Sequence, residues 1–172
     1  MIRDATEEDA AACAAVYAPY VVGTAITFET EAPGAAAFAE RIRTAQRRHA
    51  WLVAEDGLEV VGYAYGGIWR TRAAYAWCAE TTVYLRQGLR RTGAGRALMT
   101  ALLERLRALG YRRALAGATL PNEASAGLHE ALGFRPAGRF ERVGWKLGAW
   151  HDVGWYQLDL QPAEQDPPPP PT

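Results

Sequence analysis

Cysteine is scarce in this chain, which has only Cys13 and Cys78 among its 172 residues. They form no CxxC pair and have no cluster of histidines nearby, so we expect no zinc site and no other metal. We interpret both as small core residues rather than nucleophiles. The N-terminal sequence MIRDATEEDA lacks the apolar stretch of a signal peptide, and two thiols suit a reducing compartment. We therefore expect a cytoplasmic protein.

Long apolar runs and an excess of one charge are also missing. No segment approaches the roughly 18 apolar residues that a membrane span requires. Lys+Arg and Asp+Glu both number 19, so the net charge is zero and attracts neither nucleic acid nor a membrane surface as a partner. Hydrophobic residues make up 49% of the chain and charged residues 22%, which together with the length indicates one folded domain.

Hydrophobic periodicity and turn residues predict a mixed order of helices and strands. The expected helices are 6–19, 35–49, 93–109 and 122–132, and the expected strands are 2–4, 51–54, 58–68, 76–85, 112–118, 134–140 and 153–160. This order predicts an α/β (α+β) domain over 1–161, with a central, mainly antiparallel sheet flanked by helices. The proline run in 162–172 predicts a disordered tail outside that domain.

A loop of arginines and glycines, RRTGAG at 90–95, lies between a predicted strand and the longest predicted helix. Glycine lets the backbone approach a ligand closely, and free N–H groups at a helix start bind phosphate oxygens. No Gly-Lys-Ser/Thr follows and a third glycine is missing, so the loop is neither a Walker loop nor a dinucleotide fingerprint. The residues alone leave two interpretations open, a pyrophosphate site or a surface turn with solvated arginines.

Several blocks of the sequence resemble the GNAT acetyltransferase superfamily and its phosphinothricin N-acetyltransferases. The loop RRTGAG resembles the superfamily's Q/R-x-x-G-x-G/A motif. The blocks ETTVYL at 80–85, LPNEAS and LHEALGF at 120–134, and GWK with WHDVG at 144–154 resemble phosphinothricin-type enzymes in the same order. The resemblance covers nearly all of the chain except the tail. It implies the GNAT acyl-CoA N-acyltransferase fold, a twisted sheet whose splayed strands form the coenzyme A cleft.

The resemblance also implies acetyl-CoA as cosubstrate. Backbone groups of Val83 and Leu85 would pair with the pantetheine arm like an added strand. The loop would hold the pyrophosphate, and Asn122 would bond the pantetheine. The implied cofactor-binding residues are Val83, Tyr84, Leu85, Arg90, Arg91, Thr92, Gly93, Ala94, Gly95, Arg96, Asn122 and Ser125.

Glu80 is the first candidate for catalysis. A carboxylate in the middle of a strand is costly unless it is paired or functional. The acceptor amine arrives as ammonium, and Glu80 could remove its proton directly or through water. The residues alone favour an ion pair with Arg70 or Arg72, whereas the resemblance implies the catalytic base.

His129 and Leu85 are the other catalytic candidates. His129 could act as an acid or base, could order the site, or could be a bonded histidine on the helix surface. The Leu85 N–H would stabilise charge on the thioester carbonyl oxygen. We interpret His49 as a surface residue, and His151 and Asp152 as structural residues or as support for the site.

The resemblance implies direct acetyl transfer to the amine of a small glutamate-like amino acid, phosphinothricin or methionine sulfoximine. Arginine suits a carboxylate or phosphinate. The candidate substrate-binding residues are Phe28, Trp69, Arg70, Arg72, Tyr75 and Tyr84. The segment GATLP at 117–121 and Met99 depart from the family pattern and bear on acceptor specificity. A polyamine, an antibiotic or a protein N-terminus as acceptor, or a non-catalytic acyl-CoA-binding module, stay as alternatives. The resemblance also suggests a homodimer through the C-terminal strands.

Overall fold

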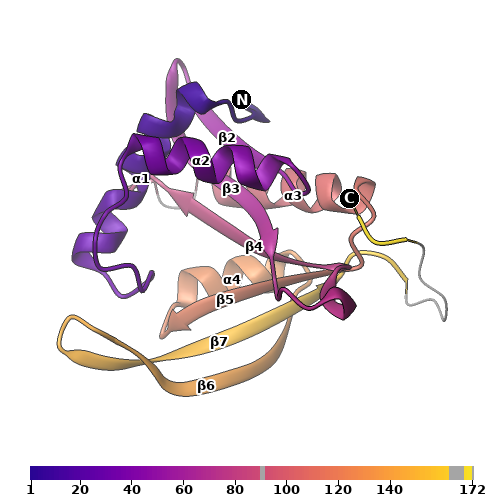
Figure 1. Cartoon of the computed structure of the whole chain (residues 1–172). Coiled ribbons are helices and arrows are strands. Elements are labelled where there is room, and N and C mark those ends of the chain that lie inside the picture. Colours follow the sequence, from indigo (N-terminus) through magenta and orange to yellow (C-terminus); the bar gives the residue numbers. More distant parts are fainter. Residues whose placement is uncertain (90–91, 163–168, 172) are drawn as a thin grey trace.

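A seven-stranded sheet crosses the molecule in the computed structural model, which describes residues 1–89, 92–162 and 169–171 (Figure 1). The strands in spatial order are β1 (Ile2–Asp4), β2 (Trp51–Asp56), β3 (Glu59–Ile68), β4 (Cys78–Leu85), β5 (Arg113–Leu120), β7 (Ala149–Asp159) and β6 (Arg135–Lys146). Neighbouring strands are antiparallel except β4 and β5, which are parallel. The predicted mainly antiparallel sheet is confirmed.

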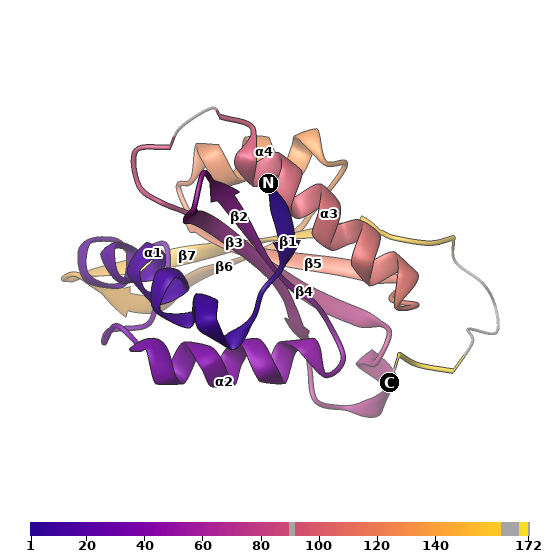
Figure 2. The same cartoon turned by 90° about the horizontal axis from the view of Figure 1, so that it is seen from above.

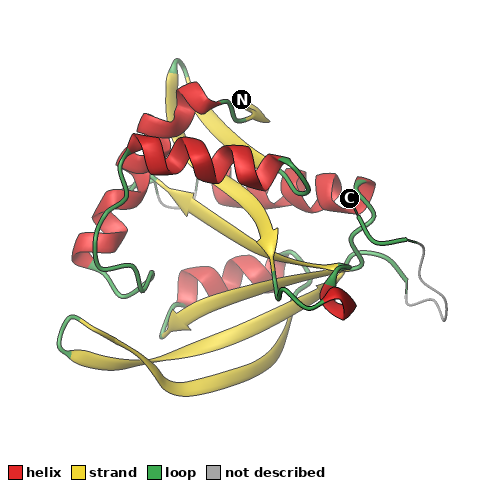
Figure 3. Ribbon diagram, viewed as in Figure 1, coloured by secondary structure: helices red, strands yellow, loops and turns green. Residues whose placement is uncertain are grey.

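Helices cover both faces of the sheet (Figures 2 and 3). Helices α1 (Ala10–Gly23) and α2 (Ala35–Gln46) lie on one face, and α3 (Ala94–Ala108) and α4 (Glu123–Ala131) on the other; η1 (Glu7–Asp9) and η2 (Ala73–Tyr75) are short 3-10 turns. The leucine stripe of α3, including Leu98, Leu102 and Leu106, is buried against the sheet. None of the helices in the described residues has the length and hydropathy that crossing a bilayer requires.

Strand β2 supplies both hydrophobic cores. Alternate strand residues point to opposite faces of a sheet. Trp51 and Val53 accordingly belong to the core under α1 and α2, while Leu52 and Ala54 belong to the core under α3. The four residues 51–54 are all apolar because both faces of β2 are buried.

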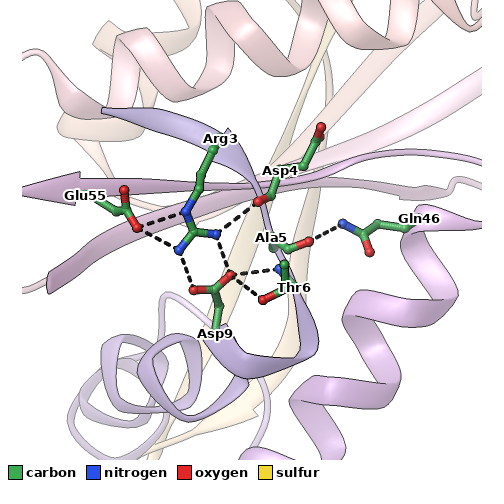
Figure 4. Close-up of polar contacts among 7 residues, drawn as sticks. All are labelled: Arg3, Asp4, Ala5, Thr6, Asp9, Gln46 and Glu55. Atoms are coloured by element: carbon green, nitrogen blue, oxygen red, sulfur yellow. Dashed lines mark hydrogen bonds and ion pairs between the residues drawn. The ribbon is translucent and has the colours of Figure 1, made fainter. Parts of the chain in front are cut away.

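A charge cluster fastens the N-terminal strand to the domain (Figure 4). The Arg3 guanidinium donates to both carboxylate oxygens of Asp9, at 2.7 and 2.8 Å, and to Glu55 on β2 at 2.7 and 2.9 Å. Asp9 also accepts the Thr6 N–H at 2.8 Å. The hydrogen bonds from Arg3 hold the pKa of the buried Asp9 carboxyl below its usual value. The cluster thus joins β1, η1 and β2 through one side chain.

Two predictions about the first helices are wrong. Helix α1 continues through Pro19 to Gly23. A proline lacks only its own N–H, and the buried Val21 keeps the following turn packed against the core. His49 is only 8% exposed and stacks on Tyr111 at 4.9 Å, so it is not a surface residue. Burial lowers the pKa of His49 to about 4.

The last two strands are longer than predicted and form one hairpin. Its turn residues, Leu147 and Gly148, both have positive φ, 52° and 75°, which suits the twist of a tight hairpin. Phe140 lies opposite Val153 and Gly144 opposite His151, so three residues of β6 bulge opposite Asp152. The Asp152 carboxylate accepts the Arg142 N–H at 2.7 Å within the bulge. The structural interpretation of Asp152 agrees with this contact.

Candidate active site

Strands β4 and β5 separate shortly after they begin. Residues 78–80 lie opposite residues 113–115, whereas β4 stays paired with β3 to Leu85 and β5 stays paired with β7 to Leu120. Figure 1 shows the two strands together at one end and apart at the other. At the point of separation the Thr81 hydroxyl donates to the Leu115 carbonyl at 3.1 Å. The sheet therefore has an internal edge along the second half of β4.

The backbone of Val83 and Leu85 faces this internal edge. The Arg86 N–H donates to the Val61 carbonyl of β3 at 2.8 Å. Alternate residues of an antiparallel strand bond to the same neighbour, so Val83 and Leu85, at the intervening positions, direct their N–H and C=O groups toward β5. The Leu85 carbonyl accepts the Tyr20 hydroxyl at 2.7 Å. The edge can therefore hydrogen-bond an extended ligand, which is the role that the family resemblance implies for Val83 and Leu85.

The start of α3 lies next to the end of β4. Gly93, with φ of 79°, precedes the helix, and the first N–H groups of a helix have no intrahelical acceptor. A Cβ on Gly95 would lie 3.3 Å from the Leu85 side chain, so glycine allows this close packing. An open hollow of ≈ 550 Å³ adjoins Thr92, Gly93 and Ala94. Arg90 and Arg91, also predicted to bind pyrophosphate, lie outside the described residues.

Glu80 is half-buried on β4 near the point of separation. Among the described residues its carboxylate has no hydrogen bond and no ion pair, so the ion pair with Arg70 or Arg72 is not formed. Burial raises the pKa of the Glu80 carboxyl, and the charge of Arg70 lowers it in part. An unpaired carboxylate with a raised pKa suits a group that exchanges protons.

His129 is 5% exposed on α4. Its ring stacks on Tyr156 at 5.2 Å, and Nδ1 lies 2.7 Å from the Ser125 carbonyl. A carbonyl only accepts, so Nδ1 carries the proton and Nε2 of the neutral ring has a free lone pair. Burial lowers the pKa of His129, although the Ser125 bond opposes this. Asn122 caps the same helix by accepting the Ser125 N–H at 3.0 Å.

Glu80 and His129 lie on opposite faces of the sheet. Ala79 and Tyr156 belong to the core under α3 and α4, and His129 stacks on Tyr156 from that side. Glu80 follows Ala79 and points the other way, as strand alternation requires. The gap between β4 and β5 therefore separates the two predicted catalytic side chains.

The predicted acceptor residues fall into separate groups. The Arg70 guanidinium carbon lies 4.8 Å from the centre of the Trp69 ring, and Trp69 meets Trp155 at 4.5 Å with the rings at 73°. Arg72 and Tyr75 are exposed around η2. Tyr84 is partly buried, edge to face with other tyrosines beneath α1. Trp69 and Arg70 are in direct contact with each other.

Phe28, in the loop between α1 and α2, packs its ring against Gly144 of the β6–β7 hairpin, where a Cβ on Gly144 would overlap it. Lys146 holds the same segment, because its ammonium donates to the Thr27 carbonyl at 2.7 Å. Lys146 is 5% exposed, and burial lowers its pKa. The sequence analysis missed this lysine and Trp155. Lys146 could have been noticed as the only lysine of the chain.

The described residues contain no group of three or more His, Cys, Asp and Glu side chains that could hold a metal ion.

Comparisons with known proteins agree on one family. The model of the acetyltransferase (GNAT) domain matches residues 2–155. Phosphinothricin N-acetyltransferase of Streptomyces viridochromogenes is 40% identical, over 93% of this chain and 87% of that protein. L-methionine sulfoximine/L-methionine sulfone acetyltransferase of Pseudomonas aeruginosa is 39% identical, over 96% of this chain and 98% of that protein. The GNAT superfamily phosphinothricin acetyltransferase from Sinorhizobium meliloti, solved in complex with AcCoA, has a TM-score of 0.90 at 32% identity, over 98% of this chain and 95% of that one.

Proposed function

Since the chain belongs to the GNAT acetyltransferase family, we propose that it transfers acetyl from acetyl-CoA to the amino group of a small glutamate-like amino acid. The observation that carries this proposal is the unpaired edge of β4, beside the start of α3, in a chain 40% identical to a phosphinothricin N-acetyltransferase. Phosphinothricin and methionine sulfoximine are the acceptors that the two enzymes' names support.

The internal edge of β4 would bind the pantetheine arm. The free N–H and C=O groups of Val83, and the Leu85 N–H, are placed to pair with its amides. Thr92, Gly93, Ala94, Gly95 and Arg96 would bind the pyrophosphate through the first N–H groups of α3, with Arg90 and Arg91 adding charge. The Asn122 amide nitrogen is available to the pantetheine, because Asn122 uses only its oxygen to cap α4.

Glu80 would act as the general base. It takes one proton of the acceptor ammonium, and the nitrogen attacks the thioester carbonyl carbon. The C–S bond then breaks, and the second proton lost by the nitrogen passes to the leaving thiolate, directly or through water, so that coenzyme A leaves as the thiol. The Leu85 N–H would stabilise the oxyanion that forms on the carbonyl oxygen, a contribution of about 2.7–4 kcal/mol for such donors.

His129 would order the site rather than donate a proton. Its single ring proton is used on the Ser125 carbonyl, and a lowered pKa leaves the ring neutral near pH 7. The imidazole then fixes α4 and Asn122 beside the gap, while its free Nε2 can accept a hydrogen bond.

Arg70 and Arg72 would bind the acceptor carboxylate or phosphinate through paired N–H donors. Trp69, Phe28, Tyr75 and Tyr84 would supply the apolar walls. We further propose that the domain spans 1–161, that the enzyme works as a homodimer in the cytoplasm, and that the residues beyond 161 form a tail. Most of that tail, 163–168 and 172, lies outside the described residues.

Turnover measured as release of free coenzyme A tests the proposal. The acceptors are L-phosphinothricin, L-methionine sulfoximine, the common amino acids, spermidine and a peptide with a free N-terminus. We expect the highest kcat/KM for the first two. A preference for spermidine or the peptide would replace the proposed acceptor. Binding of acetyl-CoA in a calorimeter, with turnover of no amine, would show a non-catalytic binding module.

A further inference from the structure

Trp155 is flanked by two glycines on the neighbouring strands, and its ring packs against only one of them. On β7 it is paired with Gly117 of β5 and with Gly138 of β6. A Cβ on Gly117 would lie 3.0 to 3.2 Å from three atoms of the Trp155 ring, whereas a Cβ on Gly138 would meet nothing within 4 Å. The ring therefore lies flat over β5, on the side of the gap between β4 and β5. A methyl group at position 117 would be too close to the ring as it lies, and would require it to shift.

From this place the Trp155 ring reaches a residue beyond the end of β3. It meets Trp69 at 4.5 Å, nearly perpendicular, and the Arg70 guanidinium lies 4.8 Å from the Trp69 ring centre. Edge-to-face aromatic pairs and cation–π contacts both have preferred geometries, so each ring restricts the next group. Arg70 itself is exposed and makes no ion pair among the described residues. The contact with the Trp69 ring is therefore the interaction available to hold its guanidinium in place.

We propose that Trp155 is a positioning residue of the reaction, which holds Arg70 beside Glu80 by packing between Gly117 and Trp69. This inference rests on the proposed role of Glu80 as the base. Neither Trp155 nor Gly117 needs to touch a substrate for it. Because Gly117 has no side chain, the Trp155 ring can pack close to the backbone of β5. The Trp155 ring in turn restricts the orientation of the Trp69 ring.

Arg70 is the one charge near Glu80 whose position the tryptophans control. Tyr65 on β3 and Cys78 on β4 lie on the same side of the sheet, and burial raises the pKa of both, so both are neutral near pH 7. Arg113, opposite Cys78 on β5, is held by an ion pair with Asp159 at 3.0 Å. Gly67 of β3 is paired with Glu80, and β3 ends at Ile68, so Arg70 follows directly on the part of β3 that lies against Glu80. From there the charge of Arg70 lowers the pKa of Glu80 against the effect of burial. Releasing Arg70 should therefore raise that pKa.

The experiment measures the Glu80 carboxyl directly. The protein is labelled with ¹³C at the glutamate carboxyl carbons, and the Glu80 resonance is assigned by its loss in Glu80→Gln. We expect the titration midpoint to move upward in Gly117→Ala, because the new methyl group displaces the ring. The midpoint should also move upward in Trp155→Leu. The shift in each of these two variants should be no larger than the shift in Arg70→Gln. The matched control, Gly138→Ala, faces open space and should leave the midpoint unchanged.

The double variant Trp155→Leu/Arg70→Gln decides whether Trp155 acts through Arg70. If it does, the double variant titrates as Arg70→Gln alone does. A midpoint unchanged in Gly117→Ala, or a further shift on adding Trp155→Leu to Arg70→Gln, would overturn the inference. The acidic limb of kcat/KM should move with the midpoint. The carboxyl titration needs no turnover, so failure of the proposed function and failure of this inference give different results.

Discussion

Replacing Glu80 with glutamine tests whether Glu80 has a catalytic role or a structural one. The amide is close in shape to the carboxylate but cannot take a proton from the acceptor. General-base catalysis contributes about 10²- to 10⁴-fold, so we expect kcat to fall by that factor, or about 2.7–5.5 kcal/mol in barrier height. The fall of kcat/KM at acidic pH, which reflects protonation of Glu80, should disappear with the carboxylate.

The same substitution should not destabilise the fold. The folded-state pKa of Glu80 is raised by burial. The Glu80 carboxyl therefore ionises more easily in the unfolded chain than in the folded protein. As a result, its ionisation at neutral pH lowers the free energy of unfolding. That destabilisation is absent below the unfolded pKa, grows as the pH rises from the unfolded toward the folded pKa, and is complete above the folded pKa. Glu80→Gln removes it, so we expect equal or higher stability at pH 7.

Steady-state kinetics and urea unfolding of the same preparations test both statements. Glu59→Gln is a suitable control, because Glu59 is an exposed glutamate on the neighbouring strand whose carboxylate forms an ion pair with Arg86. We expect the control to keep its turnover. Unchanged kcat in Glu80→Gln would remove Glu80 from the mechanism. A loss of stability at pH 7 would instead show that its carboxylate has a structural partner.

Three other substitutions or conditions test the structure at separate places. Asp9→Asn should lower the free energy of unfolding by about 1–3 kcal/mol at pH 7. Since the folded pKa of Asp9 is lowered, the difference in stability from wild type should shrink as the pH falls through that pKa. A pH-independent difference in urea titrations would contradict this. His49, with a folded pKa of about 4, binds its proton mainly in the unfolded state between that value and 6.5. Stability should therefore fall by roughly 3 kcal/mol between pH 7 and 4, and His49→Leu should make thermal unfolding less sensitive to pH over this range. Gly95→Ala should weaken acetyl-CoA binding by about 1 kcal/mol, roughly fivefold in Kd, because its methyl group crowds Leu85. Calorimetry checks this against Gly127→Ala, whose Cβ meets nothing within 4 Å, and equal affinities in the two variants would refute it.

The strand, loop and helix from Cys78 to Ala108 could be predicted closely from the sequence. Their signals are local: alternation along the strand, glycines in the loop, and an apolar stripe every three or four residues in the helix. The same locality explains why Glu80 and Gly93 could be noticed, because a carboxylate within a strand and a glycine before a helix are unusual in those positions. The role of Glu80 as base and that of Asn122 as a pantetheine ligand came from the family resemblance instead.

Other features had no local signal. The helix through Pro19 and the buried His49 depend on what packs against them, which a window of neighbouring residues does not contain. The predicted strand 134–140 ended too early and the predicted strand 153–160 began too late, because Arg142 and its neighbours bulge out of the ladder opposite Asp152. A bulge interrupts the alternation that marks a strand, although the strand itself continues.

By itself, the sequence determined the mixed α/β class, the family resemblance and the loop that begins α3, because each depends on residues close together along the chain. Only the tertiary structure decided that β4 and β5 separate beyond Glu80, that Lys146 reaches Thr27 from 119 residues away, and that Trp155 lies on Gly117. These contacts depend on strand register. A shift of one residue would turn each of these side chains to the opposite face, and periodicity along a single strand does not specify its partner.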